Sequence, residues 1–365
     1  MAAASHDEFV SLDIPLPPKV QQECSRFIAQ LRRRQVPRSL DVARKTLEIM
    51  RLLVATSAAR DVSALIAMIK QAGKVLVSAQ PHELVIGNMV RRVLYIVREE
   101  TTADESAGQR GGSSAAAAGR SLQRMLEAPQ ATDYSQQSAK DLKGPVLEVL
   151  KEVIEELSSV SSAIAEQAIE HIHSNEVILT HGRDPTVEAF LKAAHKKRTF
   201  EVVVCETSPA CEGQQTAANL AEAGISTTLI TDCAVFAMMA RVNKVIVGAH
   251  AVMANGGLVA TAGSHMVALA AQQHAVPLVV CAGLYKLTPL FPSATAEQFN
   301  LLLSPQPMLK YEEGLQGVHV ANPALDYVPP ELVSLFITNI GGNHASYIYR
   351  LLAEYYHQED HHIFE

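Results

Sequence analysis

The sequence predicts an α/β protein, with an N-terminal helical domain followed by a doubly wound, mostly parallel Rossmann-like sheet domain. In the first part of the chain, apolar residues recur at helical spacing, for example Met89, Val93, Ile96 and Val97. From Glu176 onward, short apolar runs alternate with helical patterns. This alternation is typical of strand–helix–strand units, whose right-handed crossovers place helices on both faces of a parallel sheet.

The helical domain is predicted to cover residues 19–173, after a loose N-terminus at residues 1–18. Ser39 is the expected N-cap of one helix, because its hydroxyl can accept a hydrogen bond from a free backbone N–H. A low-complexity insertion is predicted at about residues 101–140, where too little apolar surface exists to offset the entropy of ordering. A long amphipathic helix is expected to follow Pro145 and to continue to about His173.

The sheet domain is predicted at residues 174–357, with a tail at residues 358–365. In an open parallel sheet, ligands meet the chain beyond the carboxyl ends of the strands, so His250 occupies a position typical of a site residue. Residues 285–325 form a longer excursion without the alternating pattern. The expected strands are 177–180, 200–205, 227–231, 244–249 and 277–282, and the expected helices are 186–197, 212–223, 234–241 and 262–274.

The composition argues against several classes of protein. The net charge of -7, from 31 basic and 38 acidic residues, argues against a general affinity for nucleic acid or for anionic membranes. No run approaches the roughly 20 consecutive apolar residues that span a bilayer. The five cysteines are scattered and include no Cys-x-x-Cys pair, which favours a reduced protein. We therefore expect a cytoplasmic (cytosolic) location, with neither nucleic acid nor membrane as a partner.

The stretch from Lys244 to His265 is the one around which the sheet domain is organised. Val245-Ile-Val-Gly-Ala249 is typical of a buried strand, His250 follows it, and Asn255-Gly256-Gly257 suits tight backbone. This stretch closely resembles the family formed by the methylthioribose-1-phosphate isomerases and their non-enzymatic relatives in translation initiation. The resemblance to the translation-initiation branch of this family extends from about residue 20 to residue 358, apart from the insertion, and the segments most specific to that branch are 173–177, 241–245 and 339–343.

Four positions depart from the pattern of the enzymes. The isomerases carry a catalytic aspartate where this chain has His250, and a catalytic cysteine, in a Thr-His-Cys-Asn pattern, where this chain reads Thr180-His181-Gly182-Arg183. Two arginines that the isomerases place near the phosphate fall on Ser208 and Gln215. Aldose–ketose isomerisation needs side chains that move protons. The resemblance therefore implies the fold of the enzymes without their catalytic residues.

Within that family, the chain resembles the non-catalytic regulatory subunits of the guanine-nucleotide exchange factor for translation initiation factor 2. The resemblance implies direct pairing with the delta subunit and assembly with the alpha, gamma and epsilon subunits. It also implies binding of the alpha subunit of initiation factor 2, and thus a role in translation initiation and in its control by phosphorylation. The alternative is a sugar-phosphate isomerase or a sugar-phosphate sensor. Gly182, Ser208, Gln215 and His250 together argue against the isomerase.

Two further patterns have a structural interpretation. Gly182-Arg-Asp-Pro-Thr186 lies between a strand and a helix, where backbone N–H groups could hold an anion, but it lacks the glycine-rich nucleotide motifs. It is more simply the start of a helix. The histidines at 171, 173, 361 and 362 do not have the spacing of a zinc site. We therefore expect neither a cofactor nor a metal.

Two arginines are candidates for contacts with a protein partner. On the helix predicted from Asn88 to Glu100, Arg91 and Arg98 fall outside the stripe of apolar residues, given about 100° of rotation per residue. We expect both guanidinium groups to be exposed and able to form charge-assisted hydrogen bonds with a partner.

Overall fold

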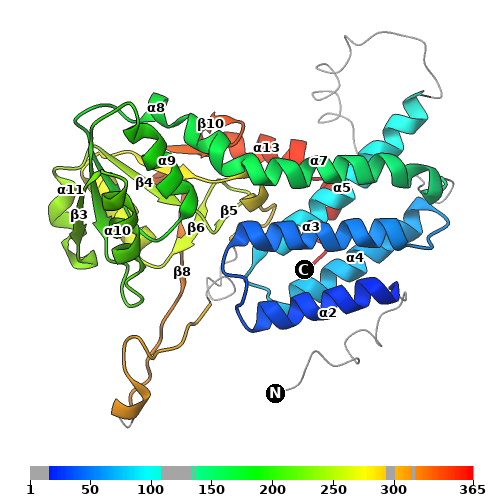
Figure 1. Cartoon of the computed structure of the whole chain (residues 1–365), viewed down its shortest axis with the longest axis horizontal. Helices are drawn as coiled ribbons and strands as arrows, with labels where there is room; N and C mark the ends of the chain where they lie inside the picture. Colours follow the sequence, from blue (N-terminus) through cyan, green and yellow to red (C-terminus); the bar gives the residue numbers. More distant parts are fainter. Residues whose placement is uncertain (1–15, 108–133, 135–136, 293–300, 315–316, 365) are drawn as a thin grey trace. The chain divides into compact units, whose positions relative to one another are not determined.

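The computed structural model describes residues 16–107, 134, 137–292, 301–314 and 317–364 (Figure 1). The chain divides into two compact units, a helical unit of residues 1–157 with 351–365 and an α/β unit of residues 158–350. This division differs from the predicted boundary at residue 173, and it assigns residues 351–357 to the helical unit. Most of the predicted loose N-terminus and most of the predicted insertion lie outside the described residues.

The helical unit is built from amphipathic helices that bury their apolar faces against one another. Asp61 starts α4 by accepting a hydrogen bond from the N–H of Ala64 at 2.7 Å. The N-cap of α3 is Arg38 rather than the predicted Ser39, and it makes no side-chain cap. The helices of this unit are α2 (Pro18–Arg32), α3 (Ser39–Thr56), α4 (Val62–Ala79), α5 (Leu84–Ala107) and the first part of α7 (Ala139–Glu166).

Two helix boundaries differ from the prediction. Helix α5 continues to Ala107, beyond the predicted start of the insertion at residue 101. Helix α7 begins before Pro145, because Ala139 and Leu142 extend the buried face that Val146 continues. It ends at Glu166, and the short α8 (Ala168–His171) follows. One missing backbone N–H at a proline thus does not end a helix whose apolar face is buried on both sides of it.

Helix α4 is the one helix of the described residues that is long and apolar enough to cross a membrane. Half of the apolar window is buried inside the structure, and the Lys70 ammonium on this helix pairs with Asp360 at 3.0 Å. Leu65, Ile69 and Leu76 are fully buried. These contacts are those of a core helix in a globular unit.

The α/β unit contains a seven-stranded sheet in the order β10-β9-β7-β4-β1-β2-β3, in which only the β9–β10 pair is antiparallel. The mostly parallel, doubly wound prediction is confirmed, and the five expected strands are each placed to within one residue at either end. The strands are β1 (Val177–Thr180), β2 (Glu201–Cys205), β3 (Ser226–Ile230), β4 (Lys244–Gly248), β7 (Leu278–Cys281), β9 (Leu335–Thr338) and β10 (Gly341–Asn343).

Helices cover both faces of this sheet. Helices α9 (Pro185–His195) and α10 (Glu212–Glu222) follow β1 and β2 and pack against each other, whereas α11 (Val235–Met239) packs against α12 (Ser264–Gln273). Right-handed crossovers that run in opposite directions from the centre of the sheet place these two pairs on opposite faces.

A small antiparallel sheet was not predicted. Strands β5 (Ala251–Val252) and β6 (Leu258–Thr261) form a hairpin across Asn255-Gly256-Gly257, and β8 (Leu325–Val328) pairs with β6. The turn fits the sequence, because Gly256 has φ 81° and its N–H donates to the carbonyl of Met253 at 2.9 Å. The hairpin occupies the segment between β4 and α12, directly after His250.

Candidate functional site

The order of the strands reverses between β1 and β4, at the centre of the sheet. From β1 the chain proceeds to β2 and β3 on one side, and from β4 to β7 and β9 on the other. Ligands of open α/β sheets bind beyond the carboxyl ends of the strands at such a reversal. Gly182 follows β1 and His250 follows β4, so the two positions that correspond to the catalytic residues of the isomerases lie at the expected place in the topology.

Neither position carries the group that the isomerases use. Gly182 has φ 79°, and a Cβ there would lie 3.0 Å from Thr261 Oγ1, so both the backbone conformation and the close packing favour glycine. The backbone N–H of His250 donates to the carbonyl of Val259 at 2.8 Å, which joins the end of β4 to the β5–β6 hairpin. These residues hold the chain in place at the centre of the sheet.

A partly buried ion pair lies near the same strand ends. Asp184 caps α9 by accepting from the N–H of Thr186 at 2.7 Å, and its other oxygen accepts from Lys286 Nζ at 3.1 Å. Gly248, at the end of β4, allows this arrangement, because a Cβ there would lie 2.2 Å from the Asp184 carboxylate. The predicted helix start within Gly182–Thr186 is confirmed, with Asp184 as the N-cap and Pro185 as the first helical residue.

The two positions that replace the phosphate-binding arginines lie away from the strand ends or turn outward. Ser208 is exposed, and its backbone N–H donates to Asp232 Oδ2 at 2.6 Å. Gln215 is exposed on α10, where its amide donates to Asn219 Oδ1 at 2.9 Å. Neither side chain supplies a positive charge for a phosphate.

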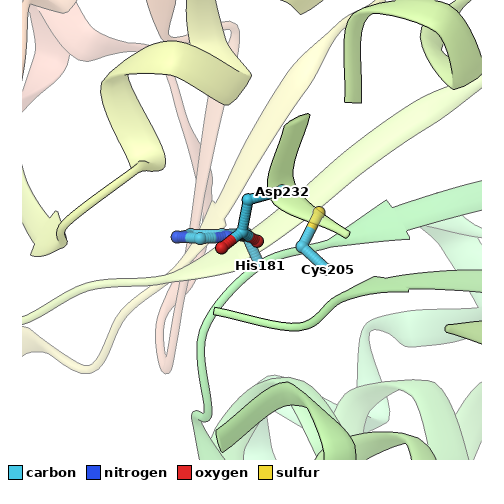
Figure 2. Close-up of side chains that lie close together, drawn as sticks. All are labelled: His181, Cys205 and Asp232. Atoms are coloured by element: carbon cyan, nitrogen blue, oxygen red, sulfur yellow. Dashed lines mark ion pairs between the residues drawn. The ribbon is translucent and has the colours of Figure 1, made fainter. Parts of the chain in front are cut away.

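Beyond the ends of β1, β2 and β3, three side chains that can bind a metal come together (Figure 2). His181 follows β1, Cys205 is the last residue of β2, and Asp232 lies just after β3. Because Thr180 pairs with Val204 and Cys205 pairs with Ile230, the three side chains emerge at nearly the same level of the sheet. One imidazole nitrogen, the thiol sulfur and a carboxylate oxygen all lie within 4.8 Å of one another.

Neighbouring groups fix the orientation of the imidazole and the carboxylate. His181 Nε2 lies 2.9 Å from the carbonyl oxygen of Ala262, which accepts only if this nitrogen carries the proton. The two Asp232 oxygens accept from the N–H groups of Thr207 at 3.0 Å and Ser208 at 2.6 Å. Thr207 has φ 60°, which is rare for a β-branched residue. The loop after β2 is therefore strained at the residue whose N–H binds the Asp232 carboxylate.

The sulfur is protonated in this environment. Burial, with the negative charge of Asp232 as a smaller contribution, raises the pKa of the Cys205 thiol to about 12. Helix α10 approaches the strand so closely that a Cβ on Gly213 would lie 1.8 Å from the carbonyl oxygen of Cys205. Cys205 is therefore not an activated nucleophile in this state.

Sequence reasoning missed this cluster because it looked for ligands at short spacings along the chain. The signal was present in a different form, since three successive predicted strands are each closed by a residue that can ligate a metal. Because β1, β2 and β3 are adjacent parallel strands, residues that follow their carboxyl ends lie close together regardless of their separation in sequence.

Comparison with known proteins places the chain in a family. A family model described as the Initiation factor 2 subunit family matches residues 35–345, which is more than half of the chain. The chain belongs to the initiation factor 2 subunit family.

Several members of this family and its relatives resemble the chain along most of its length. It is 46% identical to the translation initiation factor eIF2B subunit beta of Dictyostelium discoideum over 92% of this chain and 95% of that protein. It is 38% identical to the subunit of the same name from Schizosaccharomyces pombe over 92% of this chain and 96% of that protein. It is 32% identical to a ribose 1,5-bisphosphate isomerase of Archaeoglobus fulgidus over 60% of this chain and 71% of that enzyme.

Solved structures agree. The crystal structure of eIF2B beta from Chaetomium thermophilum matches with a TM-score of 0.74 at 30% identity, covering 93% of this chain and 94% of that one. A chain of the tetrameric eIF2B-beta2-delta2 complex from the same organism matches with a TM-score of 0.72 at 29% identity, covering 92% and 95%. The expected fold class and the resemblance to this branch of the initiation factor 2 subunit family are thus confirmed.

The prediction that Arg91 and Arg98 are exposed is wrong. Their exposed fractions are 2% and 5%, because α5 is buried on nearly all sides rather than along one stripe. Arg91 donates to the carbonyls of Asp360 and His361 at 3.1 and 3.0 Å. Arg98 binds the Asp360 carboxylate through two nitrogens at 2.9 and 3.1 Å. Within the chain, these arginines hold residues that follow more than 260 positions later.

Proposed function

We propose that this chain is a non-catalytic regulatory subunit of the guanine-nucleotide exchange factor for translation initiation factor 2, and that it acts in the cytosol. The observation that carries the proposal is its 46% identity to an eIF2B beta subunit along nearly the full length of both proteins. The chain would contribute to translation initiation by binding the alpha subunit of initiation factor 2 and by building the core of the complex. Its assembly would include the alpha, gamma and epsilon subunits.

The residues at the strand ends support a non-enzymatic role. Gly182 has no side chain that could take a proton, and Ser208 and Gln215 carry no charge for a phosphate. The pKa of the Cys205 thiol is raised to about 12, which leaves little thiolate at neutral pH. Of the two positions that are catalytic in the isomerases, His250 is the one that keeps a titratable side chain.

Two separate groups of exposed apolar side chains in the C-terminal part of the α/β unit are candidates for pairing with the delta subunit. Ile340 and Tyr349, near the β10 edge of the sheet, are 59% and 64% exposed. The excursion projecting from this unit (Figure 1) exposes Met308 by 54% and Tyr311 by 70%. Large exposed apolar side chains of this kind mark protein interfaces. A related beta2-delta2 complex supports delta as the partner.

Reconstitution tests the regulatory role. The delta, alpha, gamma and epsilon subunits of the exchange factor are purified with and without this chain. The release of GDP from initiation factor 2 is then measured, once with the alpha subunit of initiation factor 2 unmodified and once with it phosphorylated. We expect the complex that contains the chain to bind initiation factor 2 more tightly and to lose exchange activity on phosphorylation. Equal binding and equal phosphorylation response without the chain would contradict the proposal.

Turnover assays test the alternative. We expect the purified chain to convert neither ribose 1,5-bisphosphate nor methylthioribose-1-phosphate, with an archaeal ribose 1,5-bisphosphate isomerase as the positive control. Conversion that disappears in His250→Ala would establish the chain as an isomerase instead.

A further inference from the structure

We propose that His181, Cys205 and Asp232 form a binding site for a transition-metal ion, with Zn²⁺ as the best match. The site lies beyond the ends of β1, β2 and β3 (Figure 2). The site does not depend on the proposed regulatory role, because these three side chains and their neighbours alone would form it.

One ring nitrogen of His181 is buried and unsatisfied. The His181 side chain is only 1% exposed, and its Nδ1 has no hydrogen-bond partner among the described residues. With Nε2 donating to the Ala262 carbonyl, Nδ1 presents a lone pair. A buried lone pair without a donor costs free energy, so a group that accepts it is expected.

The Asp232 carboxylate and the Cys205 sulfur lie close to this nitrogen. Asp232 Oδ1 lies 3.9 Å from His181 Nδ1, too far for a hydrogen bond and close enough for a lone pair and a carboxylate to repel. Cys205 adds a sulfur to the same space. Three electron-pair donors thus face one another, and the described residues supply no cation between them. A divalent ion bound to a thiolate, a carboxylate and a neutral imidazole leaves a site of zero net charge.

Hydrogen bonds from neighbouring backbone groups orient the His181 and Asp232 side chains. Metal-binding histidines typically donate their second ring nitrogen to a carbonyl or carboxylate, and metal-binding carboxylates are themselves hydrogen-bonded. His181 does the first through Ala262, and Asp232 does the second through Thr207 and Ser208. Each carboxylate oxygen keeps a lone pair for a metal.

The chemistry of the donors selects the ion. Sulfur, imidazole and carboxylate together suit Zn²⁺, which binds all three at about 2.0–2.3 Å. Tetrahedral ligands at those bond lengths lie roughly 3.3–3.8 Å apart, so the present spread of up to 4.8 Å would contract by about an ångström. On binding, the Cys205 S–H bond breaks, the sulfur–zinc bond forms, and the proton passes to water. The Asp232 side chain is 21% exposed, which leaves a path for entry and room for a water as fourth ligand.

Co²⁺ is the probe that reports the sulfur directly. The full chain is stripped with a chelator, then titrated with Co²⁺ and, separately, with Zn²⁺ under reducing conditions. We expect one equivalent to bind, with the near-ultraviolet charge-transfer band of a cobalt–thiolate bond. Cys205→Ala should remove the band, and Asp232→Asn should weaken binding at least tenfold.

Cys281→Ala is the matched control. Cys281 is likewise a buried cysteine at the last position of a strand in the same sheet, but it lies outside the cluster. This variant should keep both the band and the stoichiometry. Thermal melting checks that each variant is folded, and if Cys205→Ala does not fold, Asp232→Asn decides. Absence of binding to the wild-type chain, or an unchanged band in Cys205→Ala, would overturn the proposal.

Discussion

Asp360 is a buried carboxylate that pairs with two basic side chains of the helical unit. It is fully buried, and its carboxylate binds Arg98 through two nitrogens and Lys70 at 3.0 Å. Burial alone would lower the pKa of Arg98, but the hydrogen bond and charge of Asp360, helped by Tyr134, raise it above its ordinary value. The arginine therefore stays charged inside the unit because its partner is fixed beside it.

Removing that negative charge should destabilise the helical unit. Asp360→Asn preserves the shape of the side chain but removes the buried negative charge beside Arg98, which then keeps only the exposed Glu359 carboxylate at 2.7 Å. Breaking a buried ion pair in this way typically costs about 3 kcal/mol. Urea denaturation followed by circular dichroism measures the change. Glu23→Gln is the control, because the Arg26–Glu23 pair is exposed and should contribute less than about 1 kcal/mol. Equal effects of the two substitutions would mean that the Asp360 contacts do not stabilise the unit.

At the scale of the element, the segment that follows α13 (Ile348–Tyr355) is part of the helical core. Tyr356 is buried. The Phe364 ring packs against two glycines, because a Cβ on Gly73 of α4 would lie 3.0 Å from it and a Cβ on Gly87 of α5 would lie 3.4 Å from it. The guanidinium of Arg91 lies 5.1 Å from the centre of the Phe364 ring. The predicted separate tail at 358–365 is therefore an integral strap of the helical unit.

This segment should detach as the pH falls. Burial, followed by the charge of Arg98 for His357 and of Arg91 for His361, lowers the pKa of both histidines below the ordinary value of 6.5. The unfolded chain then binds more protons than the folded one just below pH 6.5, so stability is full above that pH and declines as the pH falls through the depressed folded values. The protection factors of residues 351–364 against hydrogen exchange, which compare each amide with its intrinsic exchange rate at the same pH, should fall between about pH 7 and pH 5.

A double variant tests the cause of that loss of protection. His357→Gln with His361→Gln should make the protection factors of this segment much less dependent on pH, whereas the exposed His173→Gln should leave the dependence unchanged. The same pH dependence in the double variant would assign it to other groups.

At the scale of the whole molecule, the exposed apolar side chains of the α/β unit should make the isolated chain self-associate. We expect poor solubility alone and a soluble complex on co-expression with the delta subunit. Met308→Asp with Tyr311→Asp should weaken that pairing at least tenfold, or about 1.4 kcal/mol, by placing charge on the proposed interface. Phe236→Asp, at another exposed apolar position on α11, is the control that should pair normally.

Light scattering and pull-down measure this prediction. A monodisperse monomer that ignores the delta subunit would contradict the pairing itself. Loss of pairing in Phe236→Asp but not in the double variant would move the interface to the surface around α11.

Much of the α/β unit could be predicted from sequence, because its strands are continuous apolar runs between clear helical patterns. The strand Val177–Thr180 was predicted without error. The β5–β6 hairpin was missed, because Ala251–Val252 is too short to show a period of two. The site cluster and the burial of Arg98 share one cause of failure, since both depend on residues brought together from distant parts of the chain.

The return of residues 351–365 to the helical unit has a consequence for the order of synthesis. A ribosome would complete α2 to α5 and then the whole α/β unit before the strap exists. Until then, Arg98 has no Asp360 beside it. Domains generally fold as units while they emerge from the ribosome, but the helical unit cannot be completed until the C-terminal residues have been made. The nascent helical unit therefore lacks its C-terminal residues while about 190 residues are translated, which takes roughly 10–40 s at 5–20 residues per second. During that interval it is the part of the newborn chain most in need of a chaperone.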